Sequence, residues 1–406
     1  MTDSVLQQTG MQTPVPRVVH VIRSALTGGV ETHVTLVCER LARSGVPPVV
    51  VSLANVTPNS QFATAGARVV CLGDDMGWSW RTLRAIAELR NYLRAEKPDV
   101  VHLHGARPIF VGGLAARAAG VTAVISSLHG ACDLMAMRSD GVITTPRRLL
   151  AQAVHGLGFA FSKRIVVCAS RLKDDVQRSL RTVGMRAKHI AKSRLRVVYH
   201  GIDIERFGRP GAAPHSLRDG VDADTCLIGT LSRLDEPKKG IAVLLKAVAL
   251  LQEQRIPVAL RIAGDGYSRR DLEAQANKLG LANCRFLGFV DDQRDFYRSL
   301  DLFVLPSFSE GMPLVNLEAM MSGTAVITTD VGGAAEAVLD RRTGLVVPPG
   351  DEKALALAIS LLAQNPELRA RFAAAGRDRV RNEFSIDVMF KRLLAVYDEA
   401  RDKEKL

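Results

Sequence analysis

Short apolar runs rich in valine and isoleucine alternate with longer amphipathic stretches along most of the chain. An apolar run of roughly four to eight residues between polar residues is typical of a buried strand. The stretch Thr82–Glu96 shows helical spacing instead, because its large apolar residues recur every three or four positions. These residues are Leu83, Ile86, Leu89 and Leu93. Alternating strands and helices predict parallel sheets with helices on both faces.

The predicted strands fall into two series, one in each half of the chain. Those of the first half are Arg17–Arg23, Pro48–Leu53, Arg68–Leu72, Asp99–Leu103, Val121–Ser126, Arg164–Cys168 and Leu195–Tyr199. Those of the second half are Cys226–Leu231, Val258–Ala263, Cys284–Leu287, Leu302–Leu305, Ala325–Thr328 and Gly344–Val347. Residues 206–224, between the two series, are rich in Gly, Pro, Ala and Asp and lack periodicity, which predicts a linker.

This pattern predicts an α/β protein with two Rossmann-like, doubly wound domains facing a cleft. The predicted parts are a disordered lead-in at 1–15, a first domain at 16–205, the linker at 206–224, a second domain at 225–385 and a C-terminal helix at 386–406. In open parallel sheets, ligands bind beyond the carboxyl ends of the strands. Polar motifs that follow strands are therefore the candidate site.

The charge of the chain is uneven. Its formal net charge is +12, and residues 1–205 hold 26 Lys+Arg against 14 Asp+Glu, whereas residues 206–406 hold 28 of each. A basic half can attract anionic lipid, an acidic glycan or nucleic acid, and it can equally serve only as a solubilising surface. We expect no nucleic-acid partner, and the anionic-lipid, acidic-glycan and solubilising interpretations stay open at this point.

The six cysteines are scattered and form no C-x-x-C pair, so neither a zinc site nor a disulfide framework is indicated, and a reducing compartment is expected. Residues 1–16 lack the basic-then-apolar pattern of a signal peptide. No apolar run reaches the roughly 18 residues of a membrane span. We therefore expect a cytoplasmic protein, either soluble or peripheral on the inner face of the cytoplasmic membrane.

One polar motif follows the first predicted strand of each series. Gly28 and Gly29 lie between a strand and a helix, where glycines allow close backbone approach and a helix start favours an anion. The same pair also suits an ordinary structural turn. After Cys226–Leu231, Arg233 and Lys239 offer a planar guanidinium and a compact ammonium for phosphate oxygens. A solvated basic turn would show the same residues.

The segment from Glu310 to Met320 is less generic. Pro313 suits a first helical turn, which predicts Glu310 in a loop and Glu318 well inside the helix. The backbone N–H groups of Leu314 and Val315 would then be unpaired at the helix start and able to hold phosphate. Carboxylates accept hydrogen bonds from sugar hydroxyls, so the segment is a candidate sugar-binding motif.

Histidines end two strands of the first half. His104 and His129 each follow an apolar run, and a lone histidine at such a place is more often structural than functional.

The sequence Asp222-Ala223-Asp224 matches the D-x-D pattern of some metal sites. It lies in the predicted linker before a strand, so we interpret it as turn chemistry.

Taken in order, these motifs resemble the retaining GT-B glycosyltransferases typified by bacterial glycosyl transferases group 1 (family 4). The resemblance spans residues 28 to about 384. Its most specific piece is Glu310-x7-Glu318 followed by Ala-Met, and the Arg233/Lys239 pair matches as well. Further matches are His200-Gly201-Ile202-Asp203 and Gly264-Asp265-Gly266. The resemblance also implies that the C-terminal helices pack back on the first domain.

The resemblance implies roles for particular residues. Arg233 and Lys239 match the pair that binds the donor diphosphate. Glu318 matches the acid that holds the ribose hydroxyls, and Glu310 the acid that contacts the transferred sugar. The implied catalytic residues are His129, Glu310, Arg233 and Lys239. The implied donor-binding residues are Gly28, Gly29, Arg233, Lys239, Gly264, Glu310, Gly311, Met312, Pro313, Leu314, Val315 and Glu318.

Two positions depart from the family pattern, since Ser232 stands where glycine is frequent and Asp203 where asparagine is common. Neither departure removes a charged contact. No cofactor and no catalytic metal are expected, because Arg233, Lys239 and a helix dipole can neutralise the leaving diphosphate.

The resulting hypothesis is a transferase that moves a hexosyl-type sugar from a UDP- or GDP-sugar to a glycan or lipid-linked acceptor with retention of configuration. Cell-surface polysaccharide or glycolipid synthesis is the expected setting. A nucleotide-sugar epimerase of the same architecture is the alternative. A dinucleotide-dependent dehydrogenase is disfavoured, because the first strand is not followed by G-x-G-x-x-G. A catalytically inert binding module is disfavoured by the complete set of polar motifs.

The segment Pro146–Arg164 has basic ends around an apolar middle. Four of its apolar residues form one helical stripe, namely Leu149, Ala153, Leu157 and Phe161. A core helix of the first domain is the favoured interpretation. A helix that meets an anionic membrane surface is the alternative.

Overall fold

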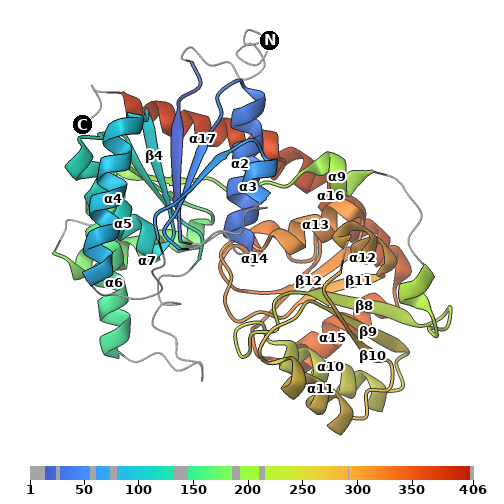
Figure 1. Ribbon diagram of the computed structural model, residues 1–406. Helices are drawn as coiled ribbons and strands as arrows, with labels where there is room; N and C mark the ends of the chain where they lie inside the picture. Colours follow the sequence, from blue (N-terminus) through green and yellow to red (C-terminus); the bar gives the residue numbers. More distant parts are fainter. Residues whose placement is uncertain are drawn as a thin grey trace. The chain divides into compact units, whose positions relative to one another are not determined.

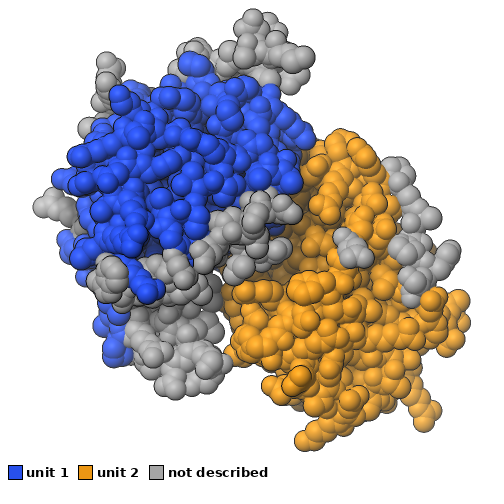
Figure 2. Space-filling model, viewed as in Figure 1, with its two compact units in different colours: residues 1–137, 143–201, 386–406 blue, residues 138–142, 202–385 orange. Residues whose placement is uncertain are grey.

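The computed structural model forms two compact units (Figure 2). Unit 1 holds residues 1–137, 143–201 and 386–406, and unit 2 holds residues 138–142 and 202–385. Each unit has its own parallel sheet and its own hydrophobic core. The residues that the structure describes are 14–23, 28–54, 61–73, 80–130, 145–184, 193–209, 215–290 and 292–402.

Unit 1 contains a seven-stranded sheet with the order β3-β2-β1-β4-β5-β6-β7, in which every neighbouring pair is parallel. Most of these strands are buried along their whole length, because helices cover both faces of the sheet (Figure 1). The strands are β1 Val18–Ile22, β2 Val49–Ser52, β3 Arg68–Cys71, β4 Val100–His104, β5 Val124–Leu128, β6 Arg164–Val167 and β7 Leu195–Val197.

The helices of unit 1 are α2 Gly29–Arg43, α3 Gln61–Thr64, α4 Trp80–Glu96, α5 Ala106–Ala119, α6 Thr145–Ala160, α7 Lys173–Thr182 and α17 Ile386–Arg401, with a 3₁₀ turn η2 at Ser170–Leu172. The C-terminal helix α17 lies beside α2 in unit 1 (Figure 1). Its apolar side chains recur every three or four residues and pack against Val18 of β1, Val100 of β4 and Ile125 of β5. A half-buried ion pair between Arg164 and Glu399, 2.9 Å long, adds to this contact.

Unit 2 contains a six-stranded parallel sheet with the order β10-β9-β8-β11-β12-β13. The strands are β8 Cys226–Leu231, β9 Val258–Ala263, β10 Cys284–Gly288, β11 Leu302–Leu305, β12 Ala325–Thr329 and β13 Leu345–Val347. The helices are α9 Ile204–Gly208, α10 Ile241–Glu253, α11 Arg269–Lys278, α12 Gln293–Ser299, α13 Leu314–Ser322, α14 Ala334–Ala337, α15 Glu352–Ala363 and α16 Pro366–Glu383, with a 3₁₀ turn η3 at His215–Arg218.

Both sheets reverse their strand order beside their first strand. In unit 1 the chain leaves β1 on one side for β2 and on the other for β4, and in unit 2 β8 lies between β9 and β11 in the same way. This reversal is the topological switch point at which doubly wound sheets bind their ligands. The predicted fold class, two Rossmann-like α/β domains, is confirmed.

Several local predictions need correction. The predicted strand Val121–Ser126 begins at Val124 instead, because α5 ends in the left-handed residue Gly120 and the N–H of Val121 still bonds back to Ala116. Pro313 is the residue before α13 and not within its first turn.

The predicted linker at 206–224 is not free of secondary structure. Helix α9 begins at Ile204, since the Asp203 side chain accepts hydrogen bonds from the N–H groups of Glu205 and Arg206 at its start. The compact units divide between Gly201 and Ile202, ahead of the boundary expected after residue 205.

Helix α6 buries a different face from the one its apolar stripe indicates. Gly156 and Gly158 bring it close to Ser179 of α7 and Ile109 of α5, where a Cβ on either glycine would collide with its neighbour. Leu149 and Leu157 of the predicted stripe are instead 51% and 45% exposed. The side chains of α6 therefore do not follow the simple core-helix interpretation.

Candidate functional site

The loop after β8 brings Lys239 into contact with Glu310, which follows β11. The Lys239 Nζ donates to Glu310 Oε1 at 2.7 Å, and Ser307 Oγ donates to the same oxygen at 2.8 Å. Both charged side chains are largely buried, with exposed fractions of 16% and 12%. Strands β8 and β11 are neighbours at the switch point, so the two predicted site residues meet where this fold binds ligands.

Arg233 lies on the same loop but points into solvent. Its guanidinium pairs with Asp235 at 2.9 Å, and its side chain is 70% exposed. An exposed pair of this kind contributes little to stability and leaves the guanidinium available to a ligand. Burial lowers the pKa of the neighbouring Lys238, and the charge of Lys239 lowers it further. The loop therefore concentrates positive charge beyond β8.

Glycines let this loop pack against its neighbours. Gly264, after β9, has a φ of +110°, and a Cβ there would collide with the carbonyl oxygen of Ser232. Gly332, with a φ of +45°, lies in the same way against the carbonyl of Glu310, and the N–H of Gly333 donates to Gly311 at 2.5 Å. Larger residues would push apart the loops that carry Arg233 and Glu310.

Helix α13 carries Glu318 and has no side-chain cap at its start. Tyr297 of α12 donates its hydroxyl to Glu318 Oε2 at 2.7 Å. Burial raises the pKa of Glu318 above its ordinary value, and the hydrogen bond from Tyr297 offsets part of that effect. The start of α13 is formed by Leu314 and Val315, whose N–H groups point along the helix axis toward its positive end.

Gly28 and Gly29 form the start of α2 in unit 1. Gly28 precedes the helix with an extended backbone, and no side chain caps this start either. A Cβ added to Gly28 would lie 2.7 Å from the Glu31 carboxylate, whereas one added to Gly29 would meet no atom of the described residues within 4 Å. This geometry is compatible with the predicted approach of the loop to a diphosphate, which stays a prediction.

His129 is not a lone histidine. Its Nε2 is hydrogen-bonded to His104 Nδ1 at 2.9 Å, and its Nδ1 to His200 Nε2 at 2.9 Å. His104 in turn bonds through Nε2 to His20 Nδ1 at 3.0 Å. Four imidazoles thus form one hydrogen-bonded row in which each neutral ring can donate to one neighbour and accept from the other.

Two further histidines flank this row. His102 is bonded to the Tyr397 hydroxyl at 2.9 Å and to Ser127 Oγ at 2.7 Å. The ring of His33, from α2, stacks on His200 with centroids 4.5 Å apart. We refer to these six residues, His20, His33, His102, His104, His129 and His200, as the histidine cluster.

Burial disfavours the charged form of five rings of the cluster. It lowers the pKa of His20 to about 3 and holds those of His33, His102, His104 and His129 well below the ordinary value. Repulsion between neighbouring rings adds to this effect at His33, where His200 and then His129 contribute. Neutral imidazoles are the form that accepts a proton or a metal ion.

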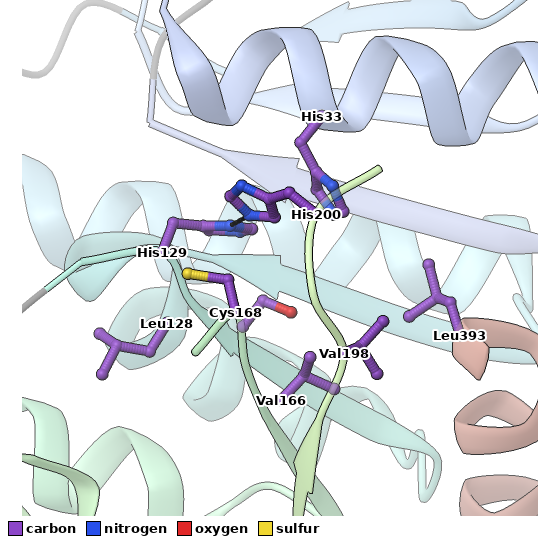
Figure 3. Close-up of a pocket in the computed structure, with 9 residues that line it drawn as sticks. His33, Leu128, His129, Val166, Cys168, Val198, His200 and Leu393 are labelled. Atoms are coloured by element: carbon purple, nitrogen blue, oxygen red, sulfur yellow. Dashed lines mark hydrogen bonds between the residues drawn. The ribbon is translucent and has the colours of Figure 1, made fainter. Parts of the chain in front are cut away.

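A small cavity of about 10 Å³ opens beside the cluster (Figure 3). The rings of His33, His129 and His200 turn toward one another at this cavity, with Cys168 beside them. Such a volume is about that of one water molecule. The cavity belongs entirely to unit 1.

The sequence indicated some of these residues and missed others. His104 and His129 stood out because they end strands, and His200 because it belongs to a motif shared with the family, but His20 and His33 carried no motif. His20 lies opposite His102 because β1 and β4 are neighbours in the sheet, and only that register brings the two together. The sequence analysis also missed Tyr297 as a partner of Glu318.

The Asp222-Ala223-Asp224 segment forms an exposed turn before β8, as interpreted from the sequence.

Two family profiles match the chain. The first, described as Glycosyltransferase Family 4, matches residues 27–206, and the second, described as Glycosyl transferases group 1, matches residues 220–379. The fold and the polar loops thus define a GT-B glycosyltransferase. The chain belongs to the group 1 glycosyltransferases and is a transferase enzyme.

Curated relatives agree with this assignment. Glycogen synthase of Mycobacterium tuberculosis is 28% identical over 93% of this chain and 92% of its own length. D-inositol 3-phosphate glycosyltransferase of Streptomyces scabiei is 31% identical over 68% of this chain and 63% of its own. Phosphatidyl-myo-inositol mannosyltransferase of Mycobacterium tuberculosis is 35% identical over 49% of this chain and 52% of its own.

Solved structures share the fold. Anabaena HepE in complex with UDP has a TM-score of 0.75 at 21% identity, with 93% of this chain and 98% of that one covered. A glycosyltransferase from Rickettsia africae has a TM-score of 0.78 at 20% identity, with 96% and 99% covered. Within the described part of the chain, no helix combines the length and apolar character needed to cross a membrane.

Proposed function

We propose that this enzyme transfers a hexosyl-type sugar from a UDP- or GDP-sugar to a glycan or lipid-linked acceptor, with retention of the anomeric configuration. The observation that carries the proposal is the contact of Lys239 with Glu310 at 2.7 Å, beyond the neighbouring strands β8 and β11. The diphosphate and the sugar are adjacent groups of one donor molecule, and the bond between them is the one that breaks. A cation that binds the diphosphate and a carboxylate that binds the sugar should therefore lie side by side in such a site.

The chemistry follows from the charge that develops on cleavage. A nucleoside diphosphate leaves with added negative charge, which Lys239 and the exposed guanidinium of Arg233 are placed on one loop to neutralise. The uncapped start of α13 supplies N–H groups and the positive end of a helix dipole. We propose that these groups replace a catalytic metal, so that cleavage needs no cofactor.

Relatives support the donor and acceptor classes. One relative is named a glycogen synthase and another a phosphatidyl-myo-inositol mannosyltransferase. HepE, which has the same fold, binds UDP and glucose in its structure. These names favour a nucleotide-sugar donor, a glycan or lipid-linked acceptor, and a role in polysaccharide or glycolipid synthesis.

The test measures nucleoside diphosphate release from a panel of UDP- and GDP-sugars, with and without glycan and lipid-linked acceptors. We expect one donor to be consumed in an acceptor-dependent way, in EDTA as well as in Mg²⁺. Product NMR should show the anomeric configuration of the donor. An inverted product, or activity that EDTA abolishes and Mn²⁺ restores, would contradict the mechanism. Release of diphosphate with a free epimerised sugar and no need for acceptor would identify the epimerase alternative.

We also propose that α6 brings the enzyme to an anionic membrane surface. Leu149, Leu150 and Leu157 are 51%, 66% and 45% exposed on this one helix, in the half of the chain that carries the whole +12 surplus. Exposed leucines on a basic domain favour an interface where apolar groups insert and basic groups meet anionic lipid. Co-sedimentation with vesicles of rising anionic-lipid content should show binding that high salt weakens.

A double variant, Leu149→Ser with Leu150→Ser, should lose most of this binding. Leu357→Ser is the matched control, because Leu357 is an exposed leucine of unit 2 with 68% exposure. Equal binding of both variants and the wild type, or no binding at low salt, would favour a soluble acceptor and a purely solubilising charge.

A further inference from the structure

Three histidines of unit 1 converge on the small cavity. One ring nitrogen each of His33, His129 and His200 lies within 4.8 Å of the other two. The three rings come from α2, from the end of β5 and from the segment after β7, and they face one another in Figure 3. We propose that His33, His129 and His200 bind a divalent transition-metal ion of the zinc type.

The three rings need to move to hold such an ion. His33 now stacks on His200, so its ring must turn to point a nitrogen at the ion. Zinc binds imidazole nitrogens at roughly 2.0–2.1 Å in a tetrahedral arrangement, which places the nitrogens about 3.3 Å apart. His129 Nδ1 and His200 Nε2 are now 2.9 Å apart, so the two rings need to separate by only a few tenths of an ångström. The cavity of about 10 Å³ beside them leaves room for an ion or its bound water.

One ring nitrogen of His33 has no hydrogen-bond partner among the described residues. This atom, His33 Nδ1, is buried. A buried polar atom in this position is costly unless a ligand satisfies it. His129 is half-buried, whereas His33 and His200 are buried.

A hydrogen bond to His104 favours the tautomer of His129 that can bind a metal ion. A metal-bound histidine normally donates its other ring N–H to an outer partner. His104 Nδ1, at 2.9 Å from His129 Nε2, is placed to accept that hydrogen bond. His129 then carries its proton on Nε2 and offers the lone pair of Nδ1. Without the ion, His200 Nε2–H donates to that lone pair, so on metal binding His200 moves its proton to Nδ1 and offers Nε2.

The second group of three, His20, His102 and His104, is a weaker candidate. Both nitrogens of His102 are already held by hydroxyl groups, of Tyr397 and Ser127. Both nitrogens of His104 are held by His20 and His129. An ion at this second group would have to break more hydrogen bonds than it would at His33, His129 and His200.

The experiment is a titration of the full chain, stripped with EDTA, with Co²⁺ and then with competing Zn²⁺. We expect one Co²⁺ per chain with the intense visible absorption of a tetrahedral site, displaced by Zn²⁺. His33→Gln and His200→Gln should each weaken binding by at least about 10-fold. His155→Gln is the control, since His155 is a buried histidine of the same unit that lies outside the cluster, and it should bind as the wild type does.

Metal-dependent stability gives a second readout that needs no enzyme activity. Zn²⁺ should raise the unfolding midpoint of the wild type and of His155→Gln, and should leave that of His33→Gln unchanged. Circular dichroism without metal checks that each variant is folded, and the wild-type stoichiometry is decisive by itself. Absence of tetrahedral Co²⁺ absorption in the wild type, equal loss in His155→Gln, or loss in His102→Gln with none in His33→Gln would overturn the proposal.

Discussion

Lys239 is the residue on which the donor site depends most directly. It is paired with Glu310 and largely buried, so it is preorganised for a diphosphate. Lys239→Ala and Arg233→Ala should each raise the activation free energy of transfer by about 2–4 kcal/mol, as the loss of one preorganised charge does. Steady-state kinetics with a saturating acceptor measures this effect.

Arg341→Ala is the matched control for the arginine, because Arg341 lies in the same unit and its side chain is 86% exposed. Its kinetics should equal those of the wild type. Near-normal turnover in both Arg233→Ala and Lys239→Ala would remove the diphosphate assignment.

Variants at Glu318 and Tyr297 distinguish a donor-binding role of the Glu318 carboxylate from a purely structural role. If this carboxylate accepts hydrogen bonds from the ribose of the donor, Glu318→Gln should raise the donor KM by roughly 10- to 100-fold. This corresponds to about 1.4–2.7 kcal/mol, the range of a hydrogen bond to a charged group. Tyr297→Phe tests the structural part, because it leaves the buried carboxylate without its 2.7 Å donor and should lower the free energy of unfolding by about 1–3 kcal/mol. A change in stability with no change in KM for Glu318→Gln would make Glu318 a structural residue only.

At the scale of elements, the loops of the donor site depend on backbone packing between β8 and β9. Gly264→Ala should destabilise unit 2 by several kcal/mol, because the new Cβ meets the Ser232 carbonyl at a φ of +110°. Gly280→Ala is the control: its φ is +67°, but no atom lies within 4 Å of the added carbon. It should cost only about 1 kcal/mol. Urea unfolding followed by circular dichroism compares the two, and equal midpoints would disprove the packing argument.

At the scale of the whole molecule, the histidine cluster makes unit 1 sensitive to acid. Folding holds the pKa of His20 at about 3 and lowers those of His33, His102, His104 and His129, whereas an unfolded histidine titrates near 6.5. Below pH 6.5 the unfolded chain therefore binds protons that the folded chain does not. Stability is full above pH 6.5 and falls as the pH drops, by about 1 kcal/mol per pH unit for each histidine.

Urea unfolding at pH 7.5, 6.5 and 5.5 tests this dependence. Circular dichroism follows the unfolding at each pH for the wild type and for His20→Gln. His20→Gln should lower the slope between pH 6.5 and 5.5 relative to the wild type. A stability that does not change over this range would mean that the cluster is protonated or open to solvent when folded.

The sequence by itself determined where the main strands and helices lie and at which strand ends polar residues collect. Strands β8, β9 and β11 have the bounds predicted from their apolar runs, because a buried strand is a local pattern of few residues. Glu310 in a loop and Glu318 within α13 follow from the same local reasoning. The polar motifs could therefore be assigned to the ends of strands from the sequence alone.

Only the tertiary structure decided which distant segments meet. His20 and His102 are neighbours because β4 lies beside β1, an order that is not the order of the chain. The exposed leucines of α6 reflect glycines that pack against α5 and α7. Helical and strand patterns arise from interactions between residues near in sequence, whereas strand order, register and helix facing depend on contacts of the whole fold, which no local pattern specifies.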